Sequence, residues 1–150
     1  MIHGHAYGVL GVGYEGRDIS AFVADLVDHG VTCVVDVRLT PISRKRGFSK
    51  TALRDALDVA GIRYEHLKAL GNPKDNRPGF GGSDHELRDA KARYAQLLDA
   101  PEAQAALDEV SAYAVNERIA VLCFEADQHR CHRDVVLSEI FRRVPVPALA

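Results

Sequence analysis

The sequence contains no tryptophan, a single methionine and only three cysteines among its 150 residues. An odd cysteine count without a C-x-x-C pair argues against a disulfide framework and against a four-cysteine zinc site. No apolar run approaches the ~20 residues that a membrane-spanning helix needs. The first residues also lack the basic and apolar regions of a secretory signal. We therefore expect a cytoplasmic protein with reduced thiols and no membrane partner.

Neither sign of charge dominates the chain, since 19 basic and 21 acidic side chains give a net charge of −2. This near balance excludes a global basic field that would recruit nucleic acid. Hydrophobic residues make up 47% and charged residues 27%, the usual balance of a globular protein. The length predicts one domain over residues 1–150, with a core of about 7–142 and a proline-containing tail over 143–150. The oligomeric state is left open.

Hydrophobic periodicity alternates along the chain between the patterns of strands and helices. Short apolar runs predict strands over 7–12, 31–37, 62–67 and 119–124, and amphipathic helices are predicted between them and after the last. Strands separated by helices pair in parallel through right-handed crossovers. We expect an α/β fold: a three-layer sandwich with a mostly parallel sheet of about four to five strands and helices on both faces.

Polar and ionisable side chains follow each predicted strand at the point where it ends. Ligands of such folds bind outside the carboxyl ends of the strands, so these positions predict a site. The candidate catalytic residues are Asp36, Glu125, Cys131 and His132. The candidate substrate or phosphate ligands are Tyr14, Glu15, Arg38, Ser43, Arg44, Phe48 and Arg133.

The densest cluster of reactive side chains surrounds Cys131, which is predicted at the start of the last helix. The positive end of a helix lowers the pKa of a thiol, which favours a thiolate nucleophile with His132 as proton shuttle, or an anion pocket. The alternative is that Cys131 only caps the helix. His129, Cys131 and His132 are all of residue types that bind metals, but their spacing argues against zinc, and we expect no metal and no cofactor. Cys33 and Cys123 fall in apolar strands and are predicted to be inert core thiols.

Segment 38–50 holds five basic residues and no acid, so the net −2 divides into +5 here and −7 elsewhere. A basic loop on an otherwise acidic protein predicts a phosphate-bearing small molecule or nucleic acid as partner, with Phe48 stacking on a base. A solvated loop paired with nearby acids is the alternative. The long segment 68–83, rich in glycine and proline, is predicted to form a lid over the site.

Gly11, Gly13 and Gly16 match G-x-G-x-x-G after the first predicted strand, and Asp36 ends the next one. This pattern predicts, as an alternative, an NAD(P)-binding Rossmann-like domain. The short remaining chain leaves little room for a second nucleotide half and a substrate domain. Arg38 would also prefer a phosphate to a ribose diol.

Five blocks of the sequence stand out together: Gly13-Tyr14-Glu15, Val35-Asp36-Val37-Arg38, Gly61-Ile62-Arg63-Tyr64, Leu122-Cys123-Phe124-Glu125 and Cys131-His132-Arg133. In this order they resemble the family called Domain of Unknown Function 488. The resemblance runs from about Tyr7 to Ile140, and members often show Leu-Gly-Gly where this chain has Leu70-Gly71-Asn72. It implies a small bacterial or archaeal α/β domain with these blocks in one pocket and no assigned reaction.

The leading hypothesis is an enzyme acting on a nucleotide or nucleic-acid substrate. Arg38, Arg44 and Arg133 would hold phosphate, because arginine binds it bidentately. Glu125 or Asp36 would be the general base. A non-catalytic module that binds nucleic acid or a partner protein is the alternative, beside the dinucleotide-binding domain.

Overall fold

Five strands form one sheet in the order β1-β2-β5-β3-β4. The computed structural model describes residues 2–4 and 8–143. Four strands are parallel, and β1 pairs antiparallel with β2 at the edge. The strands are β1 Ile2–Gly4, β2 Val9–Gly13, β3 Cys33–Asp36, β4 Arg63–His66 and β5 Ile119–Cys123. The helices are α1 Ile19–Asp28, α2 Lys50–Val59, α3 Asp84–Leu97, α4 Pro101–Asn116 and α5 Arg133–Arg143.

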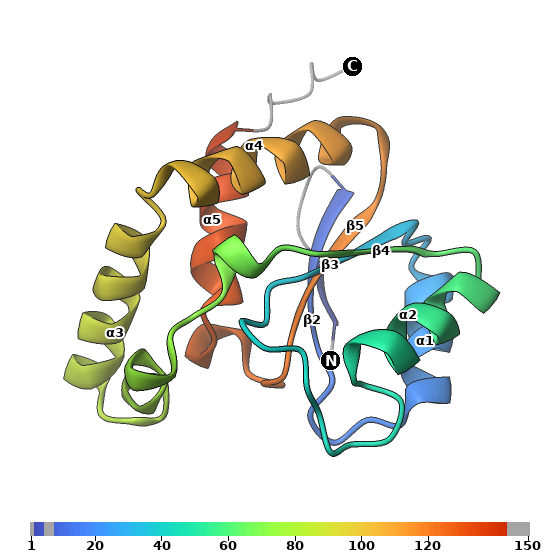
Figure 1. The fold of residues 1–150 in the computed structure, drawn as a ribbon, viewed down its shortest axis with the longest axis horizontal. Helices are drawn as coiled ribbons and strands as arrows, with labels where there is room; N and C mark the ends of the chain where they lie inside the picture. The colour runs from blue at the N-terminus through green and yellow to red at the C-terminus, as the bar shows by residue number, and fades with distance from the viewer. Residues whose placement is uncertain (1, 5–7, 144–150) are drawn as a thin grey trace.

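The helices cover both faces of the sheet and make three layers (Figure 1). Helices α1 and α2 pack on one face, where Phe22 and Leu57 meet Val34 of β3 and Leu122 of β5. Helices α4 and α5 pack on the other face in a second apolar cluster, to which α3 adds from outside by packing against α5 and segment 68–83 (Figure 1). Every residue of β2, β3 and β5 is buried, as expected for parallel strands covered on both sides. The predicted α/β sandwich is confirmed.

The crossover connections explain why helices divide between the faces. The chain runs from β2 through α1 to β3 and through α2 to β4, moving across the sheet in one direction. It then returns through α3 and α4 to β5, in the opposite direction. Right-handed crossovers running in opposite directions place their helices on opposite faces. The loops after β3 and β5, which are neighbours, therefore diverge and leave a crevice at their carboxyl ends.

Three details differ from the sequence predictions. The edge strand β1 was not predicted, and it pairs Ile2 with Val12. The first predicted strand begins at Val9 of β2, while Tyr7 and residues 144–150 of the predicted tail lie outside the described residues. The predicted loop 68–83 contains three short 3-10 turns: η2 Lys68–Leu70, η3 Lys74–Asn76 and η4 Pro78–Gly81. Among the described helices, none is both long and apolar enough to cross a membrane.

Candidate functional site

A pocket of about 230 Å³ lies at the carboxyl ends of β2, β3 and β5. The loop after each of these strands contributes to it, together with the start of α5 and segment 68–83. It is therefore the crevice that the diverging connections create. Its lining residues are Tyr14, Arg38, Leu39, Thr40, Ile42, Asn72, Arg77, Phe80, Cys123, Phe124, Glu125, Cys131 and His132.

The pocket brings together five of the residues that strand-end positions predicted. These are Tyr14, Arg38, Glu125, Cys131 and His132. The other six predicted residues are absent from its lining: Glu15, Asp36, Ser43, Arg44, Phe48 and Arg133. The sequence places all eleven at one edge of the sheet, but their side chains take different roles there.

Asp36 and Arg38 form a buried ion pair beside the pocket. Asp36 is fully buried, and its Oδ2 accepts a hydrogen bond from Arg38 Nη2 at 2.7 Å and from the Tyr64 hydroxyl at 2.5 Å. Arg38 Nη1 donates to the Tyr14 hydroxyl at 3.1 Å and to the Phe48 carbonyl at 2.6 Å. Burial alone would lower the pKa of Arg38, but the hydrogen bonds and charge of Asp36 outweigh it and raise that pKa.

This pairing corrects two predicted roles. The carboxylate of Asp36 is held by Arg38 and Tyr64 and does not line the pocket, so it is not positioned as a general base. Four of the five N–H donors of Arg38 are already engaged within the protein, counting two on Nη1, one on Nε and one on Nη2. Arg38 therefore offers a bound phosphate at most one hydrogen bond, and not a bidentate pair.

Phe48 is a core residue and is not available to stack on a base. Its ring is fully buried and stacks on Tyr14, with centroids 4.5 Å apart and an interplanar angle of 10°. It also meets Phe22 of α1 edge-on. The aromatic ring exposed in the pocket is that of Phe124, which is 43% exposed and contacts Tyr14 edge to face. Phe124 follows β5 directly, and this position at a strand end was the sequence signal that could have identified it.

Arg133 and Glu15 shape the loop after β5 and do not face the pocket. Arg133 is fully buried, and its Nη1 donates to the Glu125 carbonyl at 2.6 Å. Glu15 is exposed, and its Oε1 accepts a hydrogen bond from the backbone N–H of Ala126. Arg133 is thus a positioning residue for Glu125, in place of the predicted phosphate ligand. Arg44 is exposed on the loop before α2, where Ser43 accepts a hydrogen bond from the Lys45 N–H.

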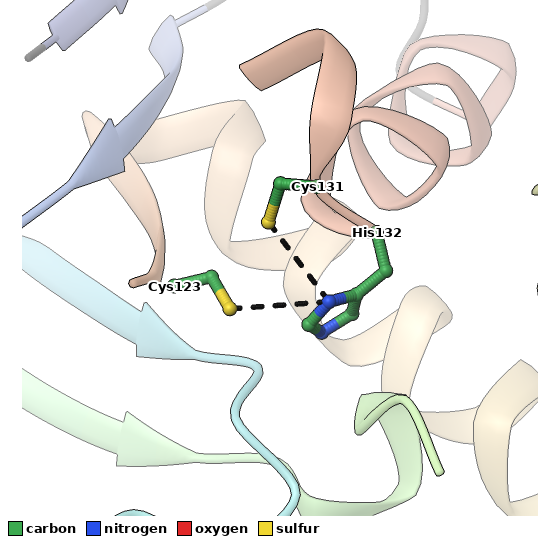
Figure 2. A group of neighbouring side chains, drawn as sticks. All are labelled: Cys123, Cys131 and His132. Carbon is green, nitrogen blue, oxygen red and sulfur yellow. Dashed lines mark hydrogen bonds between the residues drawn. The ribbon is translucent and has the colours of Figure 1, made fainter. Parts of the chain in front are cut away.

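Cys123, Cys131 and His132 form a buried cluster in the pocket wall. Figure 2 shows both thiols directed at one imidazole nitrogen, with Cys123 at the end of β5 and the other two before α5. Each Sγ lies 3.9 Å from Nδ1 of His132, and Nε2 lies 2.8 Å from the Val37 carbonyl. Because a carbonyl only accepts, Nε2 carries a proton and Nδ1 faces the two thiols. Cys123, predicted to be an inert core thiol, is part of the site.

The predicted low pKa of Cys131 is wrong. Cys131 is only 1% exposed, and this burial raises the pKa of its thiol well above its ordinary value, with a further increase from neighbouring Cys123. His132 lowers the pKa of Cys131, but by less than burial and Cys123 raise it. On His132 itself, burial lowers the pKa, but Cys131 and the Val37 carbonyl outweigh it and raise that pKa. Desolvation therefore outweighs the helix end on which the prediction rested.

Glu125 and Arg77 are the pocket's charged groups outside the Asp36–Arg38 pair. The Oε2 atom of Glu125 is buried and has no hydrogen-bond partner within residues 2–4 and 8–143. Arg77 is exposed, and its Nε donates weakly to the Asn72 carbonyl at 3.4 Å. No carboxylate of the described chain lies within ion-pair distance of Arg77. Arg77 was missed because its segment carried no chemical motif.

Segment 68–83 covers one side of the pocket with Asn72, Arg77 and Phe80. This is the location that the predicted lid would have. Several hydrogen bonds hold this segment. Asn76 donates to the Ala90 carbonyl of α3, Tyr94 donates to the Leu70 carbonyl, and Arg130 donates to the carbonyls of Phe80 and Gly82. The closed arrangement is therefore stabilised by both α3 and the loop before α5. Opening and closing remain a prediction.

The glycine motif has a structural role that contradicts the Rossmann-like interpretation. Strand β5 lies between β2 and β3, whereas the first two strands of a dinucleotide-binding unit are neighbours. A Cβ on Gly13 would lie 1.9 Å from the Glu125 carbonyl oxygen, so this glycine lets the protein's own loop approach. The side chain of Asp18 caps α1, placing an acid where a pyrophosphate would need free N–H groups.

Comparisons with known proteins show the family of this chain and give no function for it. A family model described as "Domain of unknown function DUF488" matches residues 18–140. A search of the curated proteins finds no match. A solved structure described as a "Putative phosphatase (DUF442)" from Shewanella putrefaciens CN-32 aligns with a TM-score of 0.43 and 13% identity. The alignment covers 82% of this chain and 58% of that one, and a likeness this low supports no conclusion about function.

Replacing Arg38 by methionine is expected to lower the free energy of unfolding by about 3–5 kcal/mol, because it leaves the Asp36 carboxylate buried without its partner. Urea unfolding followed by circular dichroism measures this loss. Arg63→Met is the matched control, since Arg63 pairs with Glu117 at the surface, where ion pairs contribute about 1 kcal/mol or less. Equal losses in the two variants would contradict the structural role of the buried pair.

Alkylation of Cys131 by iodoacetamide at about pH 8 is expected to be slower in the folded protein than in urea. Burial withdraws the thiol from solvent and raises its pKa, so the thiolate fraction at a given pH falls below that of a free thiol of pKa about 8.5. Mass spectrometry of digested samples resolves the rate at each cysteine. If Cys131 is alkylated faster in the folded protein than in urea, the prediction of a thiolate nucleophile at Cys131 would be supported after all.

Proposed function

Because the chain belongs to the DUF488 family, whose function is unknown, its activity has to be inferred from the pocket, and we propose an enzyme acting on a phosphate-bearing substrate. The observation that carries the proposal is the juxtaposition of Arg77, a cation without a carboxylate partner in the described chain, with Glu125, whose buried Oε2 is unpartnered. A guanidinium that is not paired binds phosphate oxygens strongly. A carboxylate with one buried oxygen that has no hydrogen-bond partner is a candidate base.

The substrate class follows from the pocket's size and its rim. A volume of about 230 Å³ is below the roughly 300–1,000 Å³ of typical ligand pockets, so it suits a phosphate and its immediate substituents. Phe124 and Ile42 line the pocket and are 43% and 80% exposed, which provides an apolar surface at its mouth. An exposed aromatic ring can stack on a base. A nucleotide with its phosphate near Arg77 and its base near Phe124 satisfies both features.

The polar residues in and beside the pocket divide between phosphate binding and proton transfer. Arg77 holds the phosphate, with the remaining N–H of Arg38 and the side-chain amide of Asn72 as further donors. Glu125 accepts a proton from the attacking group, and Arg133 keeps it in place through the loop backbone. This assignment replaces Arg44 and Arg133 as phosphate ligands and Asp36 as base.

A second candidate function is supported by a different surface. Arg44 and Arg46 are exposed on the loop between β3 and α2, Lys50 is exposed at the start of α2, and none of the three is ion-paired within the described residues. Such unpaired basic side chains beside a pocket can contact the backbone of a nucleic acid. A non-catalytic nucleic-acid-binding module would use this loop and would require no turnover at Glu125.

Arg77→Gln is expected to weaken binding of inorganic phosphate by roughly 10-fold or more, because a charge-assisted hydrogen bond contributes about 1.5–3 kcal/mol. Isothermal titration calorimetry measures the affinity. Arg88→Gln, an exposed arginine of α3 outside the pocket, is the control and should leave binding unchanged. Phe124→Ala should weaken binding of a nucleoside monophosphate while sparing inorganic phosphate. An unchanged phosphate affinity in Arg77→Gln would refute the anion pocket.

Glu125→Gln is expected to lower kcat on any phosphomonoester or diester that the protein turns over by about 10²–10⁴-fold, the usual contribution of a general base. Its phosphate affinity should stay equal or increase, because the substitution removes a negative charge beside the anion. Steady-state kinetics on a panel of nucleotide esters tests this. No turnover on the whole panel, together with salt-dependent oligonucleotide binding that Arg44→Gln weakens, would favour the binding module.

A further inference from the structure

The three side chains of the pocket wall supply the ligand atoms of a metal site. Sγ of Cys123, Sγ of Cys131 and a ring nitrogen of His132 all lie within 4.8 Å of one another, and all three residues are buried. They come from two segments, the end of β5 and the residues before α5, that the fold brings together (Figure 2). We propose that this cluster binds a zinc ion, with a fourth coordination position open to the pocket.

The spacing of the ligand atoms fits a tetrahedral ion. Zinc bonds of about 2.3 Å to sulfur and about 2.0 Å to nitrogen place a sulfur and a nitrogen ligand roughly 3.6 Å apart. Each of the two Sγ–Nδ1 distances is 3.9 Å. A shift of a few tenths of an ångström brings each sulfur–nitrogen distance to this value, and all three ligand atoms already lie within 4.8 Å of one another. Both sulfurs face the same ring nitrogen of His132, as three ligands of one shared ion would.

His132 is already oriented as a ligand. Nε2 donates to the Val37 carbonyl at 2.8 Å, which leaves Nδ1 directed toward the sulfurs. Metal-binding histidines almost always donate their second ring N–H to a carbonyl or carboxylate in this way. The ring of Tyr94 packs against His132 edge to face at 5.1 Å and further restricts its orientation. The orientation of the His132 ring is therefore already fixed in the folded protein, and metal binding does not have to order it.

The charge of the complex suits its buried position. Two thiolates and one neutral imidazole around Zn²⁺ carry no net charge, so the ion adds little uncompensated charge to the interior. Arg38, the buried cation in the pocket lining, is paired with Asp36, which offsets its repulsion of the ion. Thiolate and imidazole ligands favour zinc over the hard cations Mg²⁺ and Ca²⁺. Because zinc replaces the thiol protons, affinity is expected to rise with pH.

The fourth coordination position of the proposed zinc ion would face the pocket. All three ligands line the pocket, so the fourth ligand of a tetrahedral ion comes from the pocket side. Protein zinc sites with three side-chain ligands and one exchangeable position are typically catalytic, whereas structural sites have four side-chain ligands. The inference goes beyond the proposed function and stands on the ligand geometry, so either can fail without the other.

Spectroscopy of the full-length reduced protein tests the site without a variant. Co²⁺ added to the metal-free chain is expected to produce thiolate-to-cobalt charge-transfer absorption and the intense visible bands of a tetrahedral complex. Zn²⁺ should then displace the cobalt at about one equivalent per chain and raise the Tm, because it binds the folded state. Cobalt spectra without a sulfur charge-transfer band in the folded protein would overturn the proposal.

Variants assign the ligands. Cys123→Ala, Cys131→Ala and His132→Ala should each weaken Zn²⁺ binding by more than about 100-fold, since even second-shell losses cost 10–100-fold. Cys33→Ala is the matched control, because Cys33 is an equally buried thiol in β3 outside the cluster. Circular dichroism confirms folding of each variant. Unchanged zinc affinity in folded Cys131→Ala overturns the assignment, whereas intact zinc binding with no phosphate binding refutes only the proposed function.

Discussion

The buried pair of Asp36 and Arg38 is the interaction on which the rest of the site depends. Arg38 links the end of β3 to the loop after β2 through Tyr14, and to the segment before α2 through the Phe48 carbonyl. Asp36 links it to β4 through Tyr64. Charges at this depth are stable only when they are paired and fully hydrogen-bonded, so the geometry of the pair is strongly constrained. The same contacts build one wall of the pocket.

The part of the pocket formed by the loop after β5 depends on a close approach between two backbone segments. Gly13 has no side chain, and the carbonyl of Glu125 occupies the space that a Cβ would need. Arg133 then binds this carbonyl from inside the protein, so the loop after β5 is held from both sides. The position of the Glu125 carboxylate and the spacing between Cys123 and Cys131 follow from this loop. A motif that resembles a nucleotide fingerprint thus serves the internal packing of a different site.

The pocket separates two kinds of chemistry. Its mouth presents Arg77 and Phe124, which are accessible and suit a phosphate and a base. Its wall presents two thiols and an imidazole, which are desolvated and face one another. Desolvation makes an isolated thiolate at Cys131 unfavourable, since it raises the pKa of the thiol. The same burial favours a neutral complex in which a cation shares both sulfurs, so the cluster is better suited to a metal than to a free nucleophile.

The sequence alone was sufficient for the architecture, because the periods of apolar residues and the alternation of strands and helices constrain a parallel sheet and its layers. It also located the site at the strand ends, since parallel strands bring their carboxyl ends to one edge. It could not distinguish Arg38 and Arg133, which are buried and donate hydrogen bonds to backbone carbonyls, from Arg77, which is exposed and has no carboxylate partner among the described residues. Nor could it show that Cys123 faces Cys131 and His132. Pairing and burial depend on which side chains meet across distant segments, and only the tertiary structure decides that.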